Sequence, residues 1–104
     1  MNGYIYLGWD KNRASLAEWH RQAQWGDAEA QYQVGVRYLL GDGVPIDREK
    51  AASWWLKSAE QGYIEAQLQI GECFIDGSGV SQDVAEGINW YHKAAKLGSE
   101  NAMY

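Results

Sequence analysis

A repeat of 36 residues runs through most of this 104-residue chain. Residues 26–61 align with residues 62–97 without a gap, and 13 of the 36 aligned pairs are identical. The identical residues of the first copy are Gly26, Glu29, Ala30, Gln31, Gln33, Gly35, Gly41, Gly43, Val44, Asp47, Trp54, Lys57 and Ala59. A period of this length is typical of small structural units that cannot bury a core alone and must stack on one another.

The repeat continues beyond both full copies. The segment around Trp19 and Ala23 has the pattern of the second half of a copy, one period earlier. The predicted organisation is therefore an N-terminal segment with half a repeat (1–25), two full repeats (26–61 and 62–97) and the start of a third repeat (98–104).

Each copy has the pattern of two helices joined by a loop. In the first copy Ala30, Val34 and Tyr38 recur every four residues and share one helix face. Gly41 fits a helix end, and Asp47 fits the N-cap of the next helix. No segment alternates apolar and polar residues as a strand does. We therefore predict an all-α fold with helices near 13–25, 27–40, 47–61, 63–76 and 83–97, and a further helix that begins at 99.

Glycines and tryptophans at matching positions predict how the helices pack. Gly35 and Gly71 lie in the middle of predicted helices, where glycine costs about 1 kcal/mol relative to alanine. A partner helix is therefore expected to cross closely at both positions. Trp54 and Trp90 are expected to be buried between units, and Gly98 is expected to end the last full helix.

These residues resemble the Sel1-like repeat, a relative of the tetratricopeptide repeat. The first copy fits that pattern with Ala30, Val34, Gly35, Tyr38, Gly41, Gly43, Val44, Asp47, Ala51, Trp54, Lys57, Ser58, Ala59 and Gly62. The second copy fits it with Ala66, Ile70, Gly71, Phe74, Gly77, Gly79, Val80, Asp83, Gly87, Trp90, Lys93, Ala94, Ala95 and Gly98. Ser58 and Gly87 replace alanines of the pattern, and both are small. The resemblance covers residues 15–104 and implies a right-handed α/α superhelical solenoid whose first helices line a concave groove.

Net charge and cysteine content limit the classes of partner. The chain has nine Lys and Arg against 14 Asp and Glu, a net charge of −5, with no cluster of cations. Nucleic acid and anionic membrane surfaces are therefore disfavoured as partners. Cys73 is the single cysteine, so no internal disulfide forms. With no signal-like start after Met1, we expect a cytoplasmic protein, or an exported one if a signal peptide has been removed.

No residue pattern predicts an active site, a metal or a cofactor. His20 and His92 lie two units apart, and neither they nor Cys73 has the spacing of metal ligands. No serine precedes a lysine by three positions, as some serine nucleophiles do. The segments 41–43 and 77–79 lack the ending of a phosphate-binding loop and recur with the repeat, so we interpret them as turns. We therefore expect a protein that is not an enzyme.

The resemblance also places a candidate binding groove on the first helices. By register with the tetratricopeptide pattern, the groove residues are Glu29, Tyr32, Val36, Leu40, Glu65, Leu68, Glu72 and Asp76. Leu39 and Ile75 map there too and fit the core equally well, and Asn101 and Tyr104 would extend the groove. An apolar strip with acidic edges suits a protein or peptide segment with hydrophobic anchors and Lys or Arg. A merely solvated acidic face is the alternative.

The functional hypothesis is a non-enzymatic protein–protein interaction module, an adaptor or scaffold that holds a basic or amphipathic segment in the groove. Two alternatives stay open. The resemblance also implies an immunity-type inhibitor of a bacterial toxin, and the unfinished third unit fits a fragment of a longer solenoid. An incomplete last unit would expose Leu97, Ala102, Met103 and Tyr104, so we also expect self-association through that end.

Overall fold

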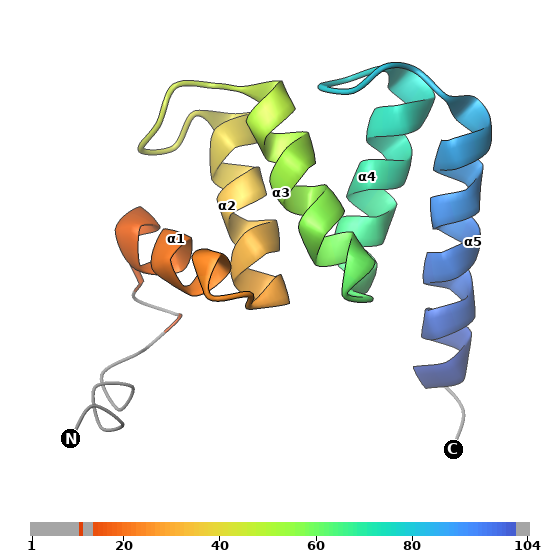
Figure 1. Ribbon diagram of the computed structural model, residues 1–104, viewed down its shortest axis with the longest axis horizontal. Coiled ribbons are helices and arrows are strands. Elements are labelled where there is room, and N and C mark those ends of the chain that lie inside the picture. The colour runs from red at the N-terminus through yellow and green to blue at the C-terminus, as the bar shows by residue number, and fades with distance from the viewer. Residues whose placement is uncertain (1–10, 12–13, 102–104) are drawn as a thin grey trace.

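The structure, a computed structural model, describes residue 11 and residues 14–101. This part of the chain forms the α-helices α1 (Leu16–Gln24), α2 (Ala28–Leu40), α3 (Arg48–Glu60), α4 (Ile64–Asp76) and α5 (Val84–Asn101), and it contains no strand. Helices α2 to α5 lie in a row, and α1 lies across the start of it (Figure 1). The predicted all-α solenoid is confirmed, and the starts of α2 to α5 agree with the prediction to within one residue.

The predicted signals that begin and end the helices are present in the structure. Asp47 is the N-cap of α3, where its side chain accepts a 3.0 Å hydrogen bond from the amide of Lys50. Gly41 ends α2 and Gly77 ends α4, and both have the same left-handed backbone, with φ 72°. The repeat in sequence is therefore also a repeat in backbone geometry.

The predicted helix end at Gly98 is wrong. Helix α5 has 18 residues and continues through Gly98 to Asn101, whereas Gly62 has φ 90° and ends the turn after α3. A glycine permits a left-handed turn but does not impose one. At Gly62 the chain turns into α4, and the Nε2 of the preceding Gln61 donates to the carbonyl oxygen of Gly26 at 2.9 Å. Leu97 occupies the matching position before Gly98, but Gly26 also turns, with φ 102°, after Trp25, so the residue before the glycine does not decide whether the chain turns.

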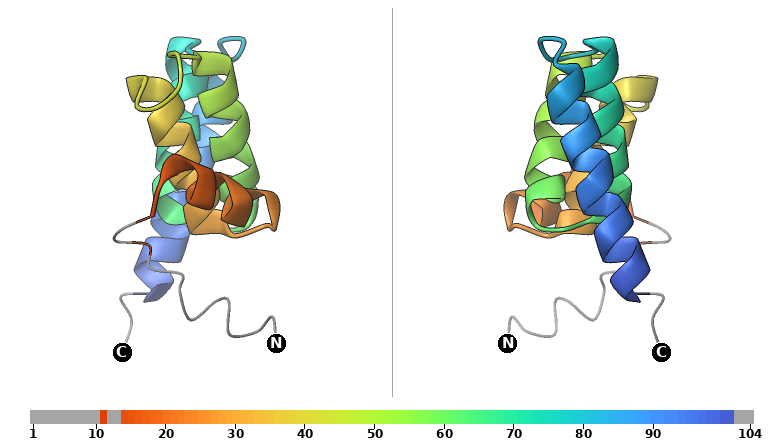
Figure 2. Two further views of the ribbon diagram at one scale, coloured as in Figure 1. Left: turned by 90° about the vertical axis from the view of Figure 1, so that its left-hand side faces the viewer. Right: turned by 90° about the vertical axis from the view of Figure 1, so that its right-hand side faces the viewer.

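Each helix packs mainly on the next one in the chain. The pairs in contact are α1 with α2, α2 with α3, α3 with α4, and α4 with α5. Seen along the row, α2 and α4 lie on one side of the array and α3 lies on the other (Figure 2). The first helices of the two repeats thus share one side of the molecule.

The core consists of two clusters of buried side chains. The smaller cluster is Trp19, Ala23, Ala30 and Val34. The larger cluster is Ala51, Ala52, Trp55, Ala59, Ala66, Ile70, Cys73 and Trp90. Small residues are frequent in both sets, so the helices approach closely, and the tryptophans are the largest side chains in them.

Close crossing at the two mid-helix glycines is confirmed. The indole of Trp55 lies against Gly35, and its Nε1 donates a 3.1 Å hydrogen bond to the carbonyl oxygen of Tyr32. A Cβ at position 35 would collide with that indole nitrogen. In the second repeat, a Cβ at Gly71 would lie 3.0 Å from the ring of Tyr91, which occupies the position of Trp55. The absence of a side chain on α2 and α4 is what lets an aromatic ring of the following helix pack there.

The prediction that Trp54 is buried is wrong, whereas the prediction that Trp90 is buried is confirmed. Trp90 is 6% exposed, but Trp54 is only half-buried, and its neighbour Trp55 is 3% exposed. Trp54 packs beside α1, with its ring edge-on to His20 at 5.3 Å between centroids. Because α1 has nine residues against 13 in α3, it covers Trp54 less completely than the larger cluster covers Trp90.

A repeated glutamine links neighbouring units, and its environment differs between them. The Nε2 of Gln31 donates to the carbonyl oxygen of Ala23, and that of Gln67 donates to Ala59, both at 3.1 Å. In the first unit the Oε1 of Gln31 accepts a 2.9 Å bond from Gln61. The buried Oε1 of Gln67 has no such partner among the described residues. Leu97 occupies the position that Gln61 occupies one repeat earlier, so the donor is missing.

We predict opposite effects of exchanging these two side chains. Gln61→Leu should lower the free energy of unfolding by about 1–3 kcal/mol, because it leaves the buried Oε1 of Gln31 without a donor. Leu97→Gln should raise it by about 0.5–1.5 kcal/mol, because the new amide can donate to Gln67. Urea denaturation followed by circular dichroism measures both. Leu97→Met is the matched control, similar in size and without a donor. A neutral Gln61→Leu variant would contradict this account of the unit junction.

Candidate binding face on α2 and α4

The surface that α2 and α4 share on one side of the array is the candidate site, and we call it the α2/α4 face. On α4 it consists of Glu65, Leu68, Glu72 and Asp76, which follow one another at three- or four-residue spacing. All four are exposed, whereas Ala66 and Ile70 on the opposite side of the helix are buried. The predicted residues of the second repeat therefore do form one continuous exposed stripe.

The predicted residues of α2 contribute less free surface. Glu29 is half-buried and is paired with Lys11, whose Nζ lies 3.1 Å from its carboxylate. Tyr32 and Val36 are half-buried and pack against the larger core cluster. Leu40 is 65% exposed at the end of the helix. The α2 side of the face is thus mainly a half-buried apolar surface, and Leu40 is its exposed apolar residue.

Aromatic rings join the two helices across this face. The ring of Tyr32 lies 5.5 Å from that of Tyr63, the N-cap residue of α4, and 6.5 Å from that of Trp55. These contacts hold the beginning of α4 beside the middle of α2. The two helices therefore share a packed aromatic cluster at one end of the face.

A small cavity opens between the helices further along. Its volume is about 90 Å³, and it is lined by Leu39, Trp55, Gln69, Glu72, Cys73, Asp76 and Ser78. Leu39, which the sequence allowed in either the groove or the core, packs on the core and also lines this cavity. Ile75 is half-buried beside Gly87 of α5. The side chain of Asn101 and all of Tyr104 lie outside the described residues.

Negative charge surrounds the aromatic cluster. Burial raises the pKa of Tyr63 to about 12, and the nearby carboxylates of Glu65 and Glu29 add to that rise. The pKa of Tyr32 is raised as well, first by burial and then by Glu65. Both phenols therefore stay neutral throughout the physiological range.

A second concentration of negative charge lies at the cavity. Burial raises the pKa of the Cys73 thiol to about 11, with further contributions from Glu72 and Asp76. Burial and the same two carboxylates also raise the pKa of Tyr91 on α5. Glu72 and Asp76 thus act on groups on both sides of α4, and their field extends across the face.

The acidic residues of α4 have no cationic partner among the described residues. The ion pairs in this part of the chain are Lys11 with Glu29 and Arg37 with Asp42, the latter at 3.6 Å. Glu65, Glu72 and Asp76 belong to neither pair. Their charges are therefore free to interact with a partner.

Comparison with known proteins identifies the family. The model of the Sel1 repeat family matches residues 28–63 and 64–99. This chain belongs to the Sel1 repeat family. The matched Sel1 units begin two residues later than the units drawn from the sequence alone, and they keep the same period. Sel1 repeats typically mediate protein–protein interactions, and proteins built from them are generally non-catalytic scaffolds.

Solved structures of other Sel1 proteins have the same fold. A Sel1 repeat protein from Oxalobacter formigenes is 40% identical, with a TM-score of 0.78 over 80% of this chain and 24% of its own. The protective antigen c5321 of uropathogenic Escherichia coli is 37% identical, with a TM-score of 0.78 over 83% of this chain and 18% of its own. The chain therefore spans less than a quarter of the length of either protein.

A third structure extends the likeness in fold alone. Cysteine-rich protein B of Helicobacter pylori is 24% identical, with a TM-score of 0.78 over 98% of this chain and 79% of its own. Among curated proteins no sequence matches this Sel1 chain. None of the helices in the described residues is both long and apolar enough to cross a membrane.

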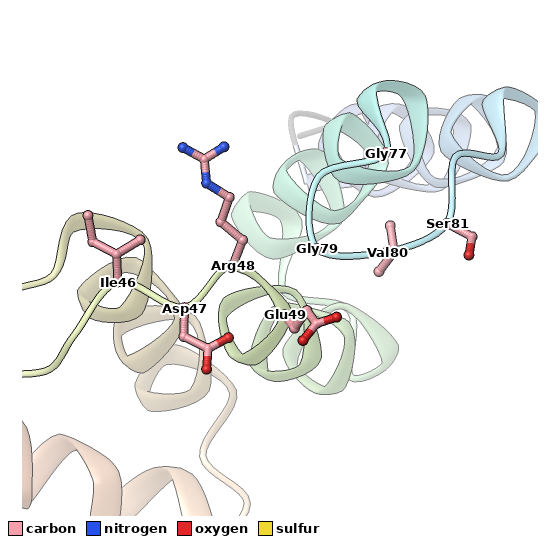
Figure 3. A pocket seen from close by; sticks show the side chains of 8 residues that line it. All are labelled: Ile46, Asp47, Arg48, Glu49, Gly77, Gly79, Val80 and Ser81. Atoms are coloured by element: carbon pink, nitrogen blue, oxygen red, sulfur yellow. The ribbon is translucent and has the colours of Figure 1, made fainter.

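The loops after α2 and α4 form a second hollow, on the edge of the Sel1 array. Its volume is about 670 Å³, and its lining is Ile46, Asp47, Arg48, Glu49, Gly77, Gly79, Val80 and Ser81 (Figure 3). Arg48 extends away from Asp47 and Glu49, so charged groups do not converge on one point (Figure 3). A Cβ at Gly79 would collide with the carbonyl oxygen of Arg48, so this glycine serves close loop packing. This geometry supports the interpretation of the glycine segments as turns.

Candidate catalytic and metal-ligating residues remain dispersed. His20 packs edge-on to Trp54, and His92 is exposed on α5. In residues 11 and 14–101, no group of three His, Cys, Asp or Glu side chains is arranged to hold a metal ion. The thiol of Cys73 is buried and its raised pKa disfavours the thiolate, the form that acts as a nucleophile.

Several residues at the site escaped the sequence analysis. The small cavity is also lined by four residues that the sequence analysis did not place at the site: Trp55, Gln69, Cys73 and Ser78. The repeat pattern assigns their positions to the core, to the side of a helix or to a turn. The repeat shows which positions are equivalent, but a cavity arises where side chains of different size stand at those positions. The alignment contains one such difference in side-chain size: the position of Arg37 in the first unit is occupied by Cys73 in the second.

We predict that Cys73 is protected in the folded protein. Because its pKa rises from 9.0 to about 11, folding should reduce the thiolate fraction at pH 8 by about a hundred-fold. Ellman's reagent should therefore label the native chain far more slowly than the chain in urea. Since the folded pKa exceeds the unfolded one, this group's contribution to stability is complete below pH 9 and declines as the pH rises toward 11. Equal labelling rates in both states would contradict the buried site.

Proposed function

We propose that this chain is a non-enzymatic interaction module whose α2/α4 face binds a protein segment that carries apolar anchors and lysine or arginine. The observation that carries the proposal is the exposed stripe of α4. It combines an exposed leucine and three carboxylates that have no cationic partner in the part of the chain that the structure describes. The family's typical role in protein interactions agrees with this proposal at the level of function class.

The charge on the stripe supports a basic partner. Glu65, Glu72 and Asp76 are exposed along about three turns of α4. Their field reaches Tyr63 at one end and Cys73 at the other. Aligned like charges on one face attract a cationic segment during its approach and select its orientation. The same charges would repel an acidic segment.

The apolar part of the face supports an amphipathic partner. Leu68 is 46% exposed between the carboxylates, and Leu40 is 65% exposed at the end of α2. The cavity whose lining includes Leu39 and Trp55 offers about 90 Å³, enough room for part of one side chain. Apolar groups that become desolvated in the complex hold it together and set its dissociation rate.

The chemistry of the described residues supports binding rather than catalysis. Cys73 is the one thiol, and its pKa of about 11 disfavours a nucleophilic role. Leu68, Leu40 and the carboxylates of α4 offer contacts and charge but no paired acid and base with an oriented nucleophile. No feature of the described residues favours inhibition of a toxin over the broader role of an adaptor.

Selection from a random peptide-display library tests this proposal. The library is panned on the chain and counter-selected on a Glu65→Lys/Glu72→Lys/Asp76→Lys variant. We expect the enriched peptides to carry Lys or Arg interspersed with apolar residues. Their affinity should fall as NaCl rises from 0.1 to 1 M, because the Debye length shrinks from about 10 Å to about 3 Å.

Matched substitutions assign the contribution of each part of the face. Glu72→Gln should mainly slow association, since charge acts on the encounter. Leu68→Ala should mainly speed dissociation, since this exposed side chain is an anchor and its loss leaves the core intact. Lys57→Ala on α3 is the control and should change neither rate. Enrichment of acidic peptides, or equal binding to the triple-lysine variant, would contradict the proposal.

A further inference from the structure

The small cavity of the α2/α4 face, which we call the Cys73 cavity, lies where a long side chain of the first repeat is replaced by a short one. Cys73 and Ser78 both line it, and the matching residues one unit earlier are Arg37 and Asp42. There the Nε of Arg37 lies 3.6 Å from the carboxylate of Asp42, so the arginine reaches from α2 to the loop that follows it. In the second repeat this side chain is missing, and a cavity of about 90 Å³ is lined by both positions.

The wall of the Cys73 cavity has an apolar part and a charged part. Leu39 of α2 and Trp55 of α3 form the apolar part, and both belong to or pack on the larger core cluster. Glu72 and Asp76, one helical turn apart on α4, form the charged part. Because Trp55 is 3% exposed whereas both acidic residues are exposed, the apolar wall lies inside and the charges lie toward solvent. This arrangement fits a side chain that has an apolar stem and a cationic end.

The negative charge at the Cys73 cavity is not balanced by the residues that the structure describes. Val36 and Leu40 occupy the positions of Glu72 and Asp76 in the first repeat. The second repeat therefore adds two carboxylates where it also loses the arginine. Neither carboxylate belongs to a described ion pair, and no described lysine or arginine lines the cavity. Burial raises the pKa of Cys73 most, and both carboxylates raise it further, so their field acts at the cavity.

An arginine suits this combination better than a lysine does. Its planar guanidinium carries several donors and can bond to two carboxylates at once, whereas the ammonium of lysine is a compact point charge. The guanidinium is also more weakly hydrated, so less free energy is lost when it leaves water. Arg37, whose side chain is 24% exposed, is an example in the first repeat of an arginine that packs at the corresponding place.

We propose that the Cys73 cavity binds one arginine side chain of the partner. The methylene stem of this arginine lies along Leu39 and Trp55. Its guanidinium lies between the carboxylates of Glu72 and Asp76. The inference rests on the proposed function, because the cavity is part of the α2/α4 face, and it names the residue of the partner that the face selects.

A small arginine derivative, N-acetylarginine methylamide, tests the cavity without a selected peptide. N-acetylcitrulline methylamide is the matched control, because citrulline has nearly the same shape as arginine and no charge. Amide ¹H–¹⁵N NMR spectra of the labelled whole chain measure the affinity for each compound. The reporters are the amides of residues 72–78 and the indole N–H of Trp55.

We expect the arginine derivative to bind at least about ten-fold more tightly than the citrulline derivative, since only its charged end is attracted by two carboxylates. Asp76→Asn should weaken its binding by about three-fold or more. Glu65→Gln removes the same charge about 10 Å along the helix from Glu72, a full Debye length at 0.1 M salt, and should leave the affinity unchanged. Thermal melts should show that both exposed substitutions leave the fold intact.

Filling the cavity from within is a second test. Cys73→Arg restores the side chain of the first repeat, and its own guanidinium should then compete for Glu72 and Asp76. We expect this variant to bind the arginine derivative about ten-fold more weakly or not at all, whereas Cys73→Ala should bind it as the native chain does. Circular dichroism checks the fold of both variants. If Cys73→Arg does not fold, Asp76→Asn and the citrulline control decide the question.

Four results would overturn the inference. They are equal or absent binding of the arginine and citrulline derivatives, equal binding of the matching lysine derivative, equal losses in Glu65→Gln and Asp76→Asn, and full binding to a folded Cys73→Arg variant. Library peptides that depend on Leu68 but tolerate citrulline at every arginine would likewise overturn it and leave the proposed function standing. Binding of the arginine derivative at the cavity, together with enrichment of acidic peptides, would contradict the proposed function alone.

Discussion

The contact between the indole of Trp55 and the bare backbone of Gly35 determines how the rest of this molecule is arranged. A side chain at position 35 would collide with the ring, so the glycine's helix cost of about 1 kcal/mol is offset by a large aromatic packed at the helix crossing. The hydrogen bond from Nε1 to Tyr32, at 3.1 Å, fixes the orientation of the ring and satisfies its one polar atom. α4 then packs in the same core cluster, and the position of α4 sets the α2/α4 face. In the second unit Tyr91 lies against Gly71 in the same manner, but its outer side is exposed.

Much of this architecture was predictable because it depends on residues that recur. The period fixed the number and order of the helices, Asp47 marked a helix start, and the mid-helix glycines marked the close crossings. The wrong predictions concern residues that match in sequence between the two units but have different neighbours in the structure. Trp54 matches the buried Trp90 but faces the shorter helix α1. Gly98 matches Gly62 but lies within α5, because a glycine permits a turn without imposing one. A repeat pattern identifies matching positions, and it does not state what covers the first and last of them.

The candidate site, in contrast, depends on residues that differ between the two units. Glu72 and Asp76 replace Val36 and Leu40, so the second unit presents charge where the first presents apolar surface. The register predicted which residues of α4 share a face, and their exposure agrees with it. It did not predict that Tyr32 would pack half-buried in an aromatic cluster, because that depends on ring contacts with residues from two other helices. Identical positions thus build the solenoid, and divergent positions give its surfaces their chemistry.

The central functional claim is that a partner contacts this chain through the exposed stripe of α4. Amide ¹H–¹⁵N NMR spectra, recorded while a selected basic peptide is titrated into the labelled chain, test it most directly. The account predicts that the largest shift changes fall on residues 65–76 and on Leu40. Changes concentrated instead around Trp25, Lys57 or His92, with the amides of α4 unmoved, would show that binding uses another surface and would contradict the assignment.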